Sequence, residues 1–416
     1  MMIKRKIYNY IFRIFFLIKL IIKALIKIPL NVFYLFIIFL PRNSNIWSIG
    51  AWEGEHFRGS CKYFYKYIKN EKKINIFWIT KNKNLFIENN KYDKNFLYAY
   101  SLKAIFILMR SKIIIFSHGL YDFLPYFTNG SKLIMINHVT FPIKDMSFYR
   151  MYNKYNLTWK IINYINSPYD HIKPDFEITS SNNVKNGIFL NENNSKDNKR
   201  ILGLGLPKTD YLVNKINEKN DKHATFKTYF SDYNFESKII LFLPTWRGDK
   251  KFSIFNNGFD NEKINKFLIN NNIYLIINFH PFDETKRLKD KINLGARIKT
   301  LTLDGEQIND LLYLSDIFMT DYSSLFSDYL LFDKEIIFTK FDHSKYTNER
   351  NLLFNYEDLP GSIINNWLDF EISVFKIFGN KNLFKQKRLD FKKKIYSDND
   401  NGKNCYNIYN FLLHLK

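Results

Sequence analysis

Residues 317–338 constrain the fold of this chain more than any other segment. Their sequence, IFMTDYSSLFSDYLLFDKEIIF, starts as an apolar run, passes through a polar stretch, and continues as a helical pattern before a second apolar run. The pattern predicts a strand, a turn, a helix and a strand, which together are the unit of a parallel α/β sheet. Hydroxyls and backbone N–H groups at the start of such a helix form a natural place to bind a phosphate.

The rest of the chain repeats this alternation and predicts two parallel sheets. Strand-like runs occupy, in a first series, residues 46–50, 76–79, 113–116, 133–136, 176–181 and 201–205, and in a second series residues 239–243, 273–278, 297–300, 317–320 and 336–339. The helical patterns between them indicate parallel crossover connections. We therefore expect an α/β fold in which two Rossmann-like domains face each other across a cleft.

Composition suggests where the domains begin and end. The stretch 214–236 is polar and rich in Asn, Lys and Asp, and we expect it to link the two domains. The predicted organisation is a membrane-associating segment over residues 1–44, a Rossmann-like domain over 45–225, a second one over 226–395, and a final helix over 396–416 that can pack back on the first domain.

The N-terminal segment combines long apolar side chains with regularly spaced lysines. Lys19, Lys23 and Lys27 recur at i, i+4 and i+8, so they lie along one side of a helix. Such a helix lies in a bilayer interface with its lysines toward the lipid phosphates. A pair of apolar core helices and a single tilted span are the alternatives, and the span would place the lysines in hydrocarbon. We expect peripheral, monotopic attachment to the cytoplasmic face of the cell membrane.

The net charge of +22 over 416 residues has three candidate explanations: nucleic acid, a membrane surface, or a nucleotide or polyanionic substrate. The chain carries no nucleic-acid-binding motif and its basic residues are spread along it, so we expect no nucleic-acid partner. Many of them lie among apolar residues in the first 45 positions, which favours an anionic lipid surface. Cys61 and Cys405 provide neither a disulfide framework nor a metal-ligand spacing and indicate a reducing compartment.

Polar side chains stand where several predicted strands end, which is where open parallel sheets bind ligands. His138, Arg247, His280 and the pair 323–324 occupy such positions. His280 can donate a proton to a phosphate or a leaving group, or it can be structural. Arg247 can bind phosphate with its planar guanidinium, or lie at the surface beside Trp246. The two serines can bind a diphosphate, cap the helix, or do both.

Two histidines in the first half are candidate bases, because a group with a pKa near neutrality can take a proton from an attacking hydroxyl. His118 lies in the sequence Ser-His-Gly and can equally be a turn residue, so His138 is preferred. Asp321 and Asp328 lie seven positions apart with no second carboxylate cluster, which does not indicate a metal site. We interpret Asp321 as structural or nucleotide-orienting, and expect neither a metal nor another cofactor.

The order of these motifs resembles that of the CDP-glycerol glycerophosphotransferases of teichoic-acid and capsule synthesis, the TagB/TagF-like group. The resemblance covers roughly residues 45–365 and is strongest in the C-terminal half. The matching stretches are LPTWR at 243–247, FHP at 279–281, the signature at 310–328, Tyr346 with Arg350, YEDLPG at 356–361, GLPKTD at 205–210 and GAWEG at 50–54. The family places its first histidine in Trp-His-Gly, whereas His138 follows Asn137 and precedes Val139, and Lys208 stands where Arg is usual.

The resemblance implies a GT-B fold with an acceptor domain followed by a CDP-donor domain. The enzyme would move glycerol phosphate, or another polyol phosphate, from CDP-glycerol or another CDP-polyol to a hydroxyl of a lipid-linked glycan or polymer, releasing CMP. His138 would deprotonate the acceptor hydroxyl, and His280 would bind the diphosphate and assist catalysis. The other donor contacts would be Thr245, Arg247, Pro281, Asp321, Ser323, Ser324 and Asp328, with His118, Lys208 and Asp210 as accessory residues.

Two other functions fit the same sequence. A GT-B glycosyltransferase with a nucleotide-sugar donor would bind phosphate in a similar way, and only the TDYSS and YEDLPG motifs separate it from a CDP-polyol enzyme. A non-catalytic membrane scaffold of the same fold is suggested by the altered surroundings of His138. Nucleotide binding and the release of CMP distinguish these three functions.

Overall fold

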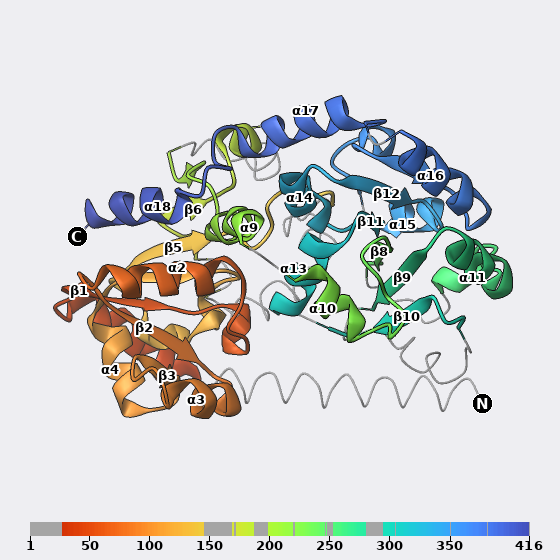
Figure 1. Cartoon of the computed structure of the whole chain (residues 1–416). Helices are drawn as coiled ribbons and strands as arrows, with labels where there is room; N and C mark the ends of the chain where they lie inside the picture. The colour runs from red at the N-terminus through yellow and green to blue at the C-terminus, as the bar shows by residue number, and fades with distance from the viewer. Residues whose placement is uncertain are drawn as a thin grey trace, which may run out of the picture.

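The computed structural model describes residues 27–144, 169, 172–186, 199–218, 221–245, 247, 253–279, 294–303, 305–349, 351–380 and 382–415. This part of the chain forms two domains, each built on its own sheet with helices packed against it (Figure 1). Every pairing between neighbouring strands of the two sheets is parallel. The predicted α/β architecture with two parallel sheets is therefore confirmed.

The first sheet is buried on both faces. Its strands, in spatial order, are β3 (Phe96–Tyr98), β2 (Asn75–Thr80), β1 (Asn43–Ile49), β4 (Ser111–Phe116), β5 (Lys132–Ile136), β6 (Phe176–Ile178) and β7 (Ile201–Leu202). Along β4, Ile113 and Ile115 share a cluster with α2 (Gly59–Glu71), whereas Ile114 and Phe116 share one with α4 (Leu102–Arg110). Successive strand residues face opposite sides, so a strand covered on both faces reads as a continuous apolar run.

The second sheet is also buried on both faces. Its strands, in spatial order, are β10 (Ile298–Leu301), β9 (Ile273–Asn278), β8 (Lys238–Leu243), β11 (Ile317–Thr320), β12 (Glu335–Thr339) and β13 (Ser362–Ile364). Ile239 and Leu241 of β8 pack with α13 (Gly305–Leu314) and α14 (Leu325–Tyr329). Ile240 and Phe242 pack on the other face with α11 (Asn261–Asn270) and α16 (Leu368–Gly379).

Each predicted strand corresponds to an observed one, but two short strands were not predicted, and the stretch expected to be a linker contains a helix. The strands β3 and β13 have only three residues each, too few to show a pattern in the sequence. The predicted linker 214–236 contains the end of α9 (Pro207–Asn217) and the helix α10 (Lys222–Lys227). A side-chain cap starts α10, since Asp221 accepts the N–H of Ala224 at 2.8 Å. Capping thus makes a helix where composition alone indicated a linker.

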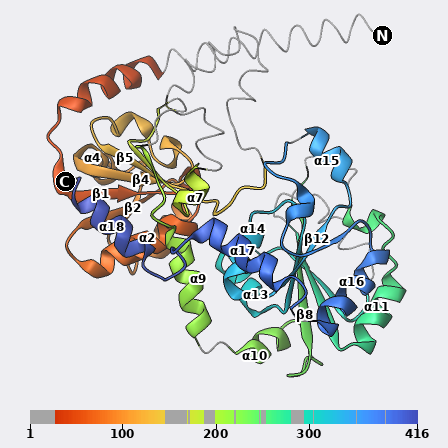
Figure 2. The same ribbon diagram turned by 90° about the horizontal axis from the view of Figure 1, so that it is seen from above.

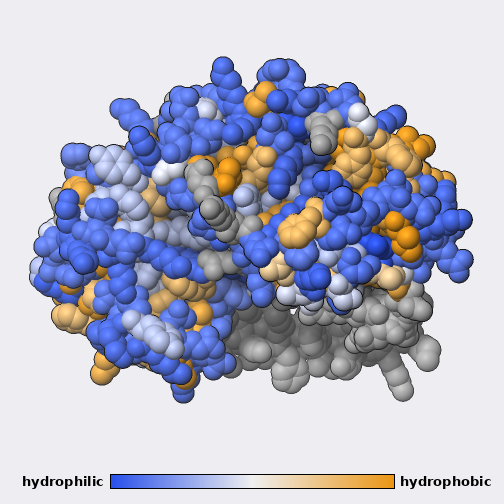
Figure 3. Space-filling view, in the orientation of Figure 1, coloured by the Kyte–Doolittle hydropathy of each residue, from blue (hydrophilic) through white to orange (hydrophobic). Residues whose placement is uncertain are grey.

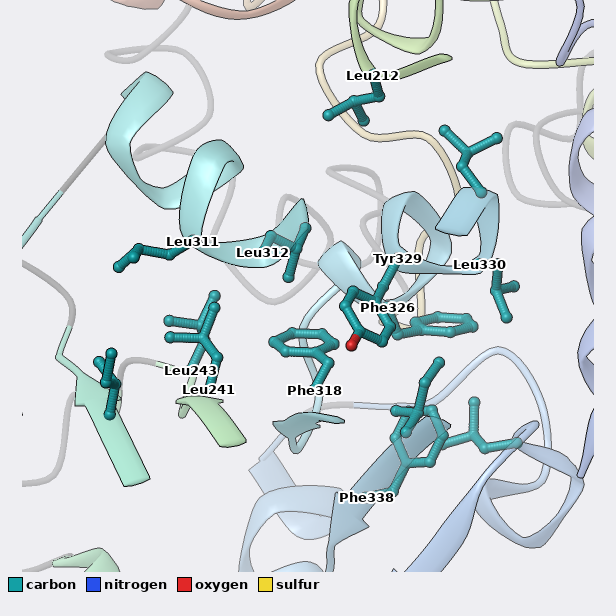
Figure 4. Close-up of a cluster of buried hydrophobic side chains, with 14 of the residues drawn as sticks. Leu212, Leu241, Leu243, Leu311, Leu312, Phe318, Phe326, Tyr329, Leu330 and Phe338 are labelled. Carbon is teal, nitrogen blue, oxygen red and sulfur yellow. The ribbon is translucent and has the colours of Figure 1, made fainter. Parts of the chain in front are cut away.

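The two domains share one buried apolar cluster. Phe141, which follows β5, and Leu212 of α9 come from the first domain. They pack with Phe326 and Tyr329 of α14 in the second domain (Figure 4). The helix that begins just after the TDYSS motif is therefore in direct contact with the first domain.

The C-terminal helices cross from the second domain back to the first (Figure 2). At the end of α17 (Lys385–Tyr396), the hydroxyl of Tyr396 donates to the carbonyl of Ser327 at 2.9 Å. The next helix, α18 (Asn404–Leu413), is buried against the first sheet, with the ring of Tyr409 6.0 Å from that of Trp47. This crossover is a second physical connection between the domains.

The described N-terminal residues form a short helix beside the first domain. Residues 27–36 are helical and lead into the turn η1 (Ile37–Phe39), while residues 1–26 of the predicted membrane segment lie outside the described residues. Asn129 donates to the carbonyl of Tyr34 at 2.9 Å, and Tyr169 donates to the Asn31 side chain at 2.7 Å. Among the helices that the structure describes, none has the length and apolar content needed to cross a bilayer.

Candidate active site

Two histidines lie together at the carboxyl ends of neighbouring strands of the first domain. His118 follows β4 and His138 follows β5, and their rings stack with centroids 4.1 Å apart. Trp52, in the turn after β1, lies 4.5 Å from the ring of His118 and 5.8 Å from that of His138. The structure thus brings the two candidate bases of the sequence into one aromatic cluster rather than separating them.

A buried carboxylate that the sequence did not single out fixes the loops of this cluster. Asp122 accepts the backbone N–H groups of Glu53 at 2.6 Å, Ser117 at 2.8 Å and His118 at 3.2 Å. It therefore ties the turn after β1 to the loop after β4. Trp52 and Glu53 have φ values of 55° and 56°, a conformation that costs energy and persists only where the surroundings impose it. Only the fold shows that these distant loops converge on Asp122.

Both histidines are neutral at pH 7. Burial, followed by the positive charge of Lys208, lowers the pKa of His138 to about 4. Burial, His138 itself and Arg58 lower the pKa of His118 to about 3. The Nδ1 of His118 is engaged with the hydroxyl of Ser117 at 2.7 Å. A neutral imidazole has one nitrogen that can accept a proton, which is what a general base needs.

In the second domain, the PTWR and TDYSS motifs are joined by one carboxylate. Asp321 accepts the backbone N–H of Thr245 at 2.8 Å and also its hydroxyl, and Arg247 donates to the second oxygen of Asp321 at 2.9 Å. Arg247 makes two further bonds, of 2.7 and 2.9 Å, to Asp342. Its guanidinium lies 4.6 Å from the ring of Tyr346. Arg247, Thr245 and Asp321 are thus bonded to one another, and a direct contact with the donor stays a prediction.

The serines of the TDYSS motif lie at the start of α14 and are partly exposed. Ser323 accepts the N–H of Leu325 at 3.3 Å, which is a weak local cap, and Ser324 makes no side-chain cap bond. Their predicted contact with a diphosphate stays a prediction. The other predicted donor contacts, His280 and Pro281, lie outside the described residues, two and three positions beyond the end of β9 at Asn278.

Asp328 contacts the first domain in this structure, and its predicted contact with the donor stays a prediction. Its carboxylate is buried between the domains, where Lys208 of α9 donates at 2.5 Å and Thr140 donates at 2.8 Å. Both carboxylate oxygens are therefore occupied by groups of the first domain. Lys208, predicted as an accessory residue, is half of this ion pair and also acts on the pKa of His138.

Asp210, the third accessory residue, lies in the first turn of α9 and contacts the start of α18. Its two oxygens accept the backbone N–H groups of Asn404 at 3.0 Å and Cys405 at 2.7 Å. A carboxylate there satisfies N–H groups that have no partner within the helix. Asp210 therefore fixes α18 to α9, and its carboxylate is occupied by this structural contact.

Comparison with known proteins identifies the family. The family model described as CDP-Glycerol:Poly(glycerophosphate) glycerophosphotransferase matches residues 32–414. The chain is 29% identical over 178 residues to the teichoic acid ribitol-phosphate polymerase TarL of Staphylococcus aureus (strain NCTC 8325 / PS 47), a match that covers 40% of this chain and 29% of that protein. It is 26% identical over 401 residues to a teichoic acid glycerol-phosphate transferase of the same strain, covering 92% of this chain and 97% of that protein.

Solved structures share the fold. A structure of the wall teichoic acid polymerase TagF matches with a TM-score of 0.69 and 18% identity, covering 95% of this chain and 96% of that one. The matched segment covers only 29–32% of the length of three ribitol-phosphate polymerases, TarL among them. The family model, in contrast, spans nearly the whole chain. The chain therefore belongs to the CDP-glycerol:poly(glycerophosphate) glycerophosphotransferase family.

Proposed function

We propose that this protein transfers glycerol phosphate, or a related polyol phosphate, from a CDP-alcohol to an acceptor hydroxyl in the synthesis of a teichoic-acid-like or capsule polymer. The observation that carries the proposal is the stacked, neutral pair His118 and His138 at the strand ends of the first domain. It occurs in a chain matched by the family model over residues 32–414. The arrangement of the two sheets supports assignment to the GT-B class, with the acceptor on the first domain and the CDP-alcohol on the second.

The reaction needs few groups. His138 takes the proton of the acceptor hydroxyl as the oxygen bonds to the β-phosphorus of the donor. The bond from that phosphorus to the bridging oxygen breaks, and CMP leaves. Ser323 and Ser324 would bind the diphosphate, and the negative charge of the donor would raise the low pKa of His138 toward the range in which a base works best. His280 would share the binding of the diphosphate.

The donor is tested by incubating the full chain with CDP-glycerol, CDP-ribitol and a UDP-sugar in the presence of a membrane lipid acceptor. CMP should be released from a CDP-polyol, and mass spectrometry should show the acceptor heavier by one polyol phosphate unit. If only the UDP-sugar serves as a donor, the proposal is wrong and the protein is a glycosyltransferase. No thermal shift with CDP and no product from any donor would leave only the scaffold function.

We further propose that the protein lies on the membrane surface through its N-terminal helix. Leu35, Phe36 and Phe39 expose 63, 64 and 82% of their surface, although the helix is fixed to the first domain by polar contacts. On α4, which lies nearby (Figure 2), Leu102 and Phe106 are exposed as well. An apolar face of this kind on a basic protein is suited to an anionic lipid surface.

Replacing Leu35, Phe36 and Phe39 together by serine should weaken co-sedimentation with vesicles of anionic phospholipid, since each apolar side chain contributes roughly 1.5–3 kcal/mol when fully buried. A matched control replaces Leu368, Ile372 and Phe375, exposed apolar residues of α16, which belongs to the second domain (Figure 2). Figure 3 shows apolar surface over this part of the second domain. That control should sediment as the unaltered protein does. Equal binding of both variants would exclude residues 27–40 as the attachment site.

A further inference from the structure

A groove of about 430 Å³ opens between the two domains, beside the histidine cluster but outside it. The first domain contributes the turn after β1, the start of α2 and the start of α3 (Lys83–Asn90). The second domain contributes Gly305 and Gln307 at the start of α13. A ligand in this groove would therefore touch both halves of the protein at once.

The lining of the groove mixes charges with hydrogen-bonding side chains. Arg58 and Lys62 supply positive charge, Glu55 and Glu88 supply carboxylates, and Asn82, Asn84 and Gln307 supply carboxamides. Cations bind phosphate oxygens, while carboxylates and carboxamides bind hydroxyls. A chain in which phosphates alternate with hydroxyl-bearing carbons matches this mixture. The groove has too few apolar groups to bind a lipid tail. An uninterrupted polyanion would be repelled by the carboxylates of Glu55 and Glu88.

Arg58 connects the groove to the candidate base. Its guanidinium lies 3.9 Å from the ring centroid of Trp52, and Trp52 contacts both His118 and His138. The groove and the histidine pair are therefore separated by one aromatic side chain. If the terminal hydroxyl of an acceptor polymer lies at His138, the units before it would extend toward Arg58.

We propose that this groove binds the polyol-phosphate segment of the acceptor that precedes the reacting hydroxyl. The proposal rests on the function proposed above and adds the place and the chemistry of acceptor recognition. It assigns Arg58 and Lys62 to the phosphates, and Asn84 and Gln307 to the hydroxyls. The nucleotide of the donor is the other possible occupant, and the experiment separates the two.

The probe is a soluble synthetic oligomer of three or four glycerol phosphate units, titrated into the full chain by calorimetry. Arg58→Gln should weaken its binding at least about tenfold, because a hydrogen bond to a charged group is lost. Asn84→Asp is a second variant, at an exposed position where a carboxylate favours the start of α3 and leaves the fold intact. This variant should weaken binding of the oligomer, because the new carboxylate repels its phosphates, and should leave CDP binding unchanged. Lys66→Gln, on the exposed side of α2, is the control that should bind both ligands as before.

Three outcomes would overturn the proposal: no binding of the oligomer, unchanged affinity for it in both groove variants, or a loss of CDP affinity in place of oligomer affinity. The last would assign the groove to the donor. Release of CMP by the unaltered protein is measured separately and tests the function itself. If the groove variants weaken oligomer binding but the unaltered protein releases no CMP, the groove still binds polyol phosphate and the proposed transferase activity is wrong.

Discussion

Replacing His138 with alanine is expected to lower kcat for transfer by at least about 10²-fold, because the acceptor hydroxyl loses the group that takes its proton. The affinity for CDP should change little, since His138 lies on the first domain and the diphosphate is assigned to the second. The measurement is CMP release under saturating donor, together with calorimetry of CDP. His414→Ala, at an exposed position near the end of α18, is the control and should keep full activity.

A pH series gives this variant a second readout. The pKa of His138 is about 4 in the folded protein and that of His118 about 3, both below the ordinary value near 6.5. The unfolded chain therefore binds more protons than the native one as the pH falls from about 6.5 toward 4. Stability contributed by neutral histidines is present above that window and is lost as the pH falls through it. His138→Ala should show a shallower loss of stability over the same window.

Retention of activity by His138→Ala would move the base to its stacked neighbour. In that case His118→Ala should show the loss instead, with Ser117 fixing the imidazole through its 2.7 Å bond. Activity retained by both single variants would remove the general-base assignment from the histidine pair. A loss of CDP affinity equal to the loss of kcat would show that the variant had disturbed the donor domain rather than the base.

The fold could be predicted from the sequence because each buried strand reads as an uninterrupted apolar run. The runs at 113–116 and 273–278, for example, became β4 and β9 with almost unchanged bounds. Short-range contacts were harder to predict. The helix α10 starts at the side-chain cap of Asp221, a contact between neighbouring residues that composition over twenty positions hides.

The candidate site was only partly predictable, because its positions depend on pairing between distant segments. The stacking of His118 on His138 follows from the adjacency of β4 and β5, which a one-dimensional pattern does not specify. Asp122 and Asp342 are ordinary acidic residues in the sequence, and only the fold shows them receiving distant donors. Asp328 lies four positions after the TDYSS motif, and only the fold shows that it pairs with Lys208 of the other domain.

Side chains of α14 connect the two domains. The helix α14 carries Ser324 at its start and Asp328 one turn later. Asp328 accepts hydrogen bonds from Lys208 and Thr140, and the pKa of His138 is lowered by burial and then by the charge of Lys208. The helix α14 thus lies between the serines of the predicted donor contact and the first domain.

Replacing Arg247 with alanine is expected to lower the free energy of unfolding of the second domain by about 3–5 kcal/mol, the range for breaking a buried ion pair. The side chains of Arg247, Asp321 and Asp342 expose only 9, 4 and 9% of their surface. Burial opposes the charge of Arg247, yet Asp321 and Asp342 outweigh it and raise the pKa of the guanidinium above its ordinary value. Without it, two carboxylates remain buried without their main partner.

The measurement is urea unfolding, with Arg247→Lys expected to recover only part of the loss because an ammonium cannot make the planar two-sided contact. Lys263→Ala is the control: its ion pair with Glu371, at 3.8 Å, is long and only partly buried, so its loss should cost no more than about 1 kcal/mol. CDP affinity should fall with stability in Arg247→Ala, since the PTWR and TDYSS loops lose the group that joins them. If stability were unchanged while CDP affinity fell, Arg247 would be a direct ligand of the diphosphate, as the sequence first indicated, and its pairing with Asp342 would be broken when the donor binds.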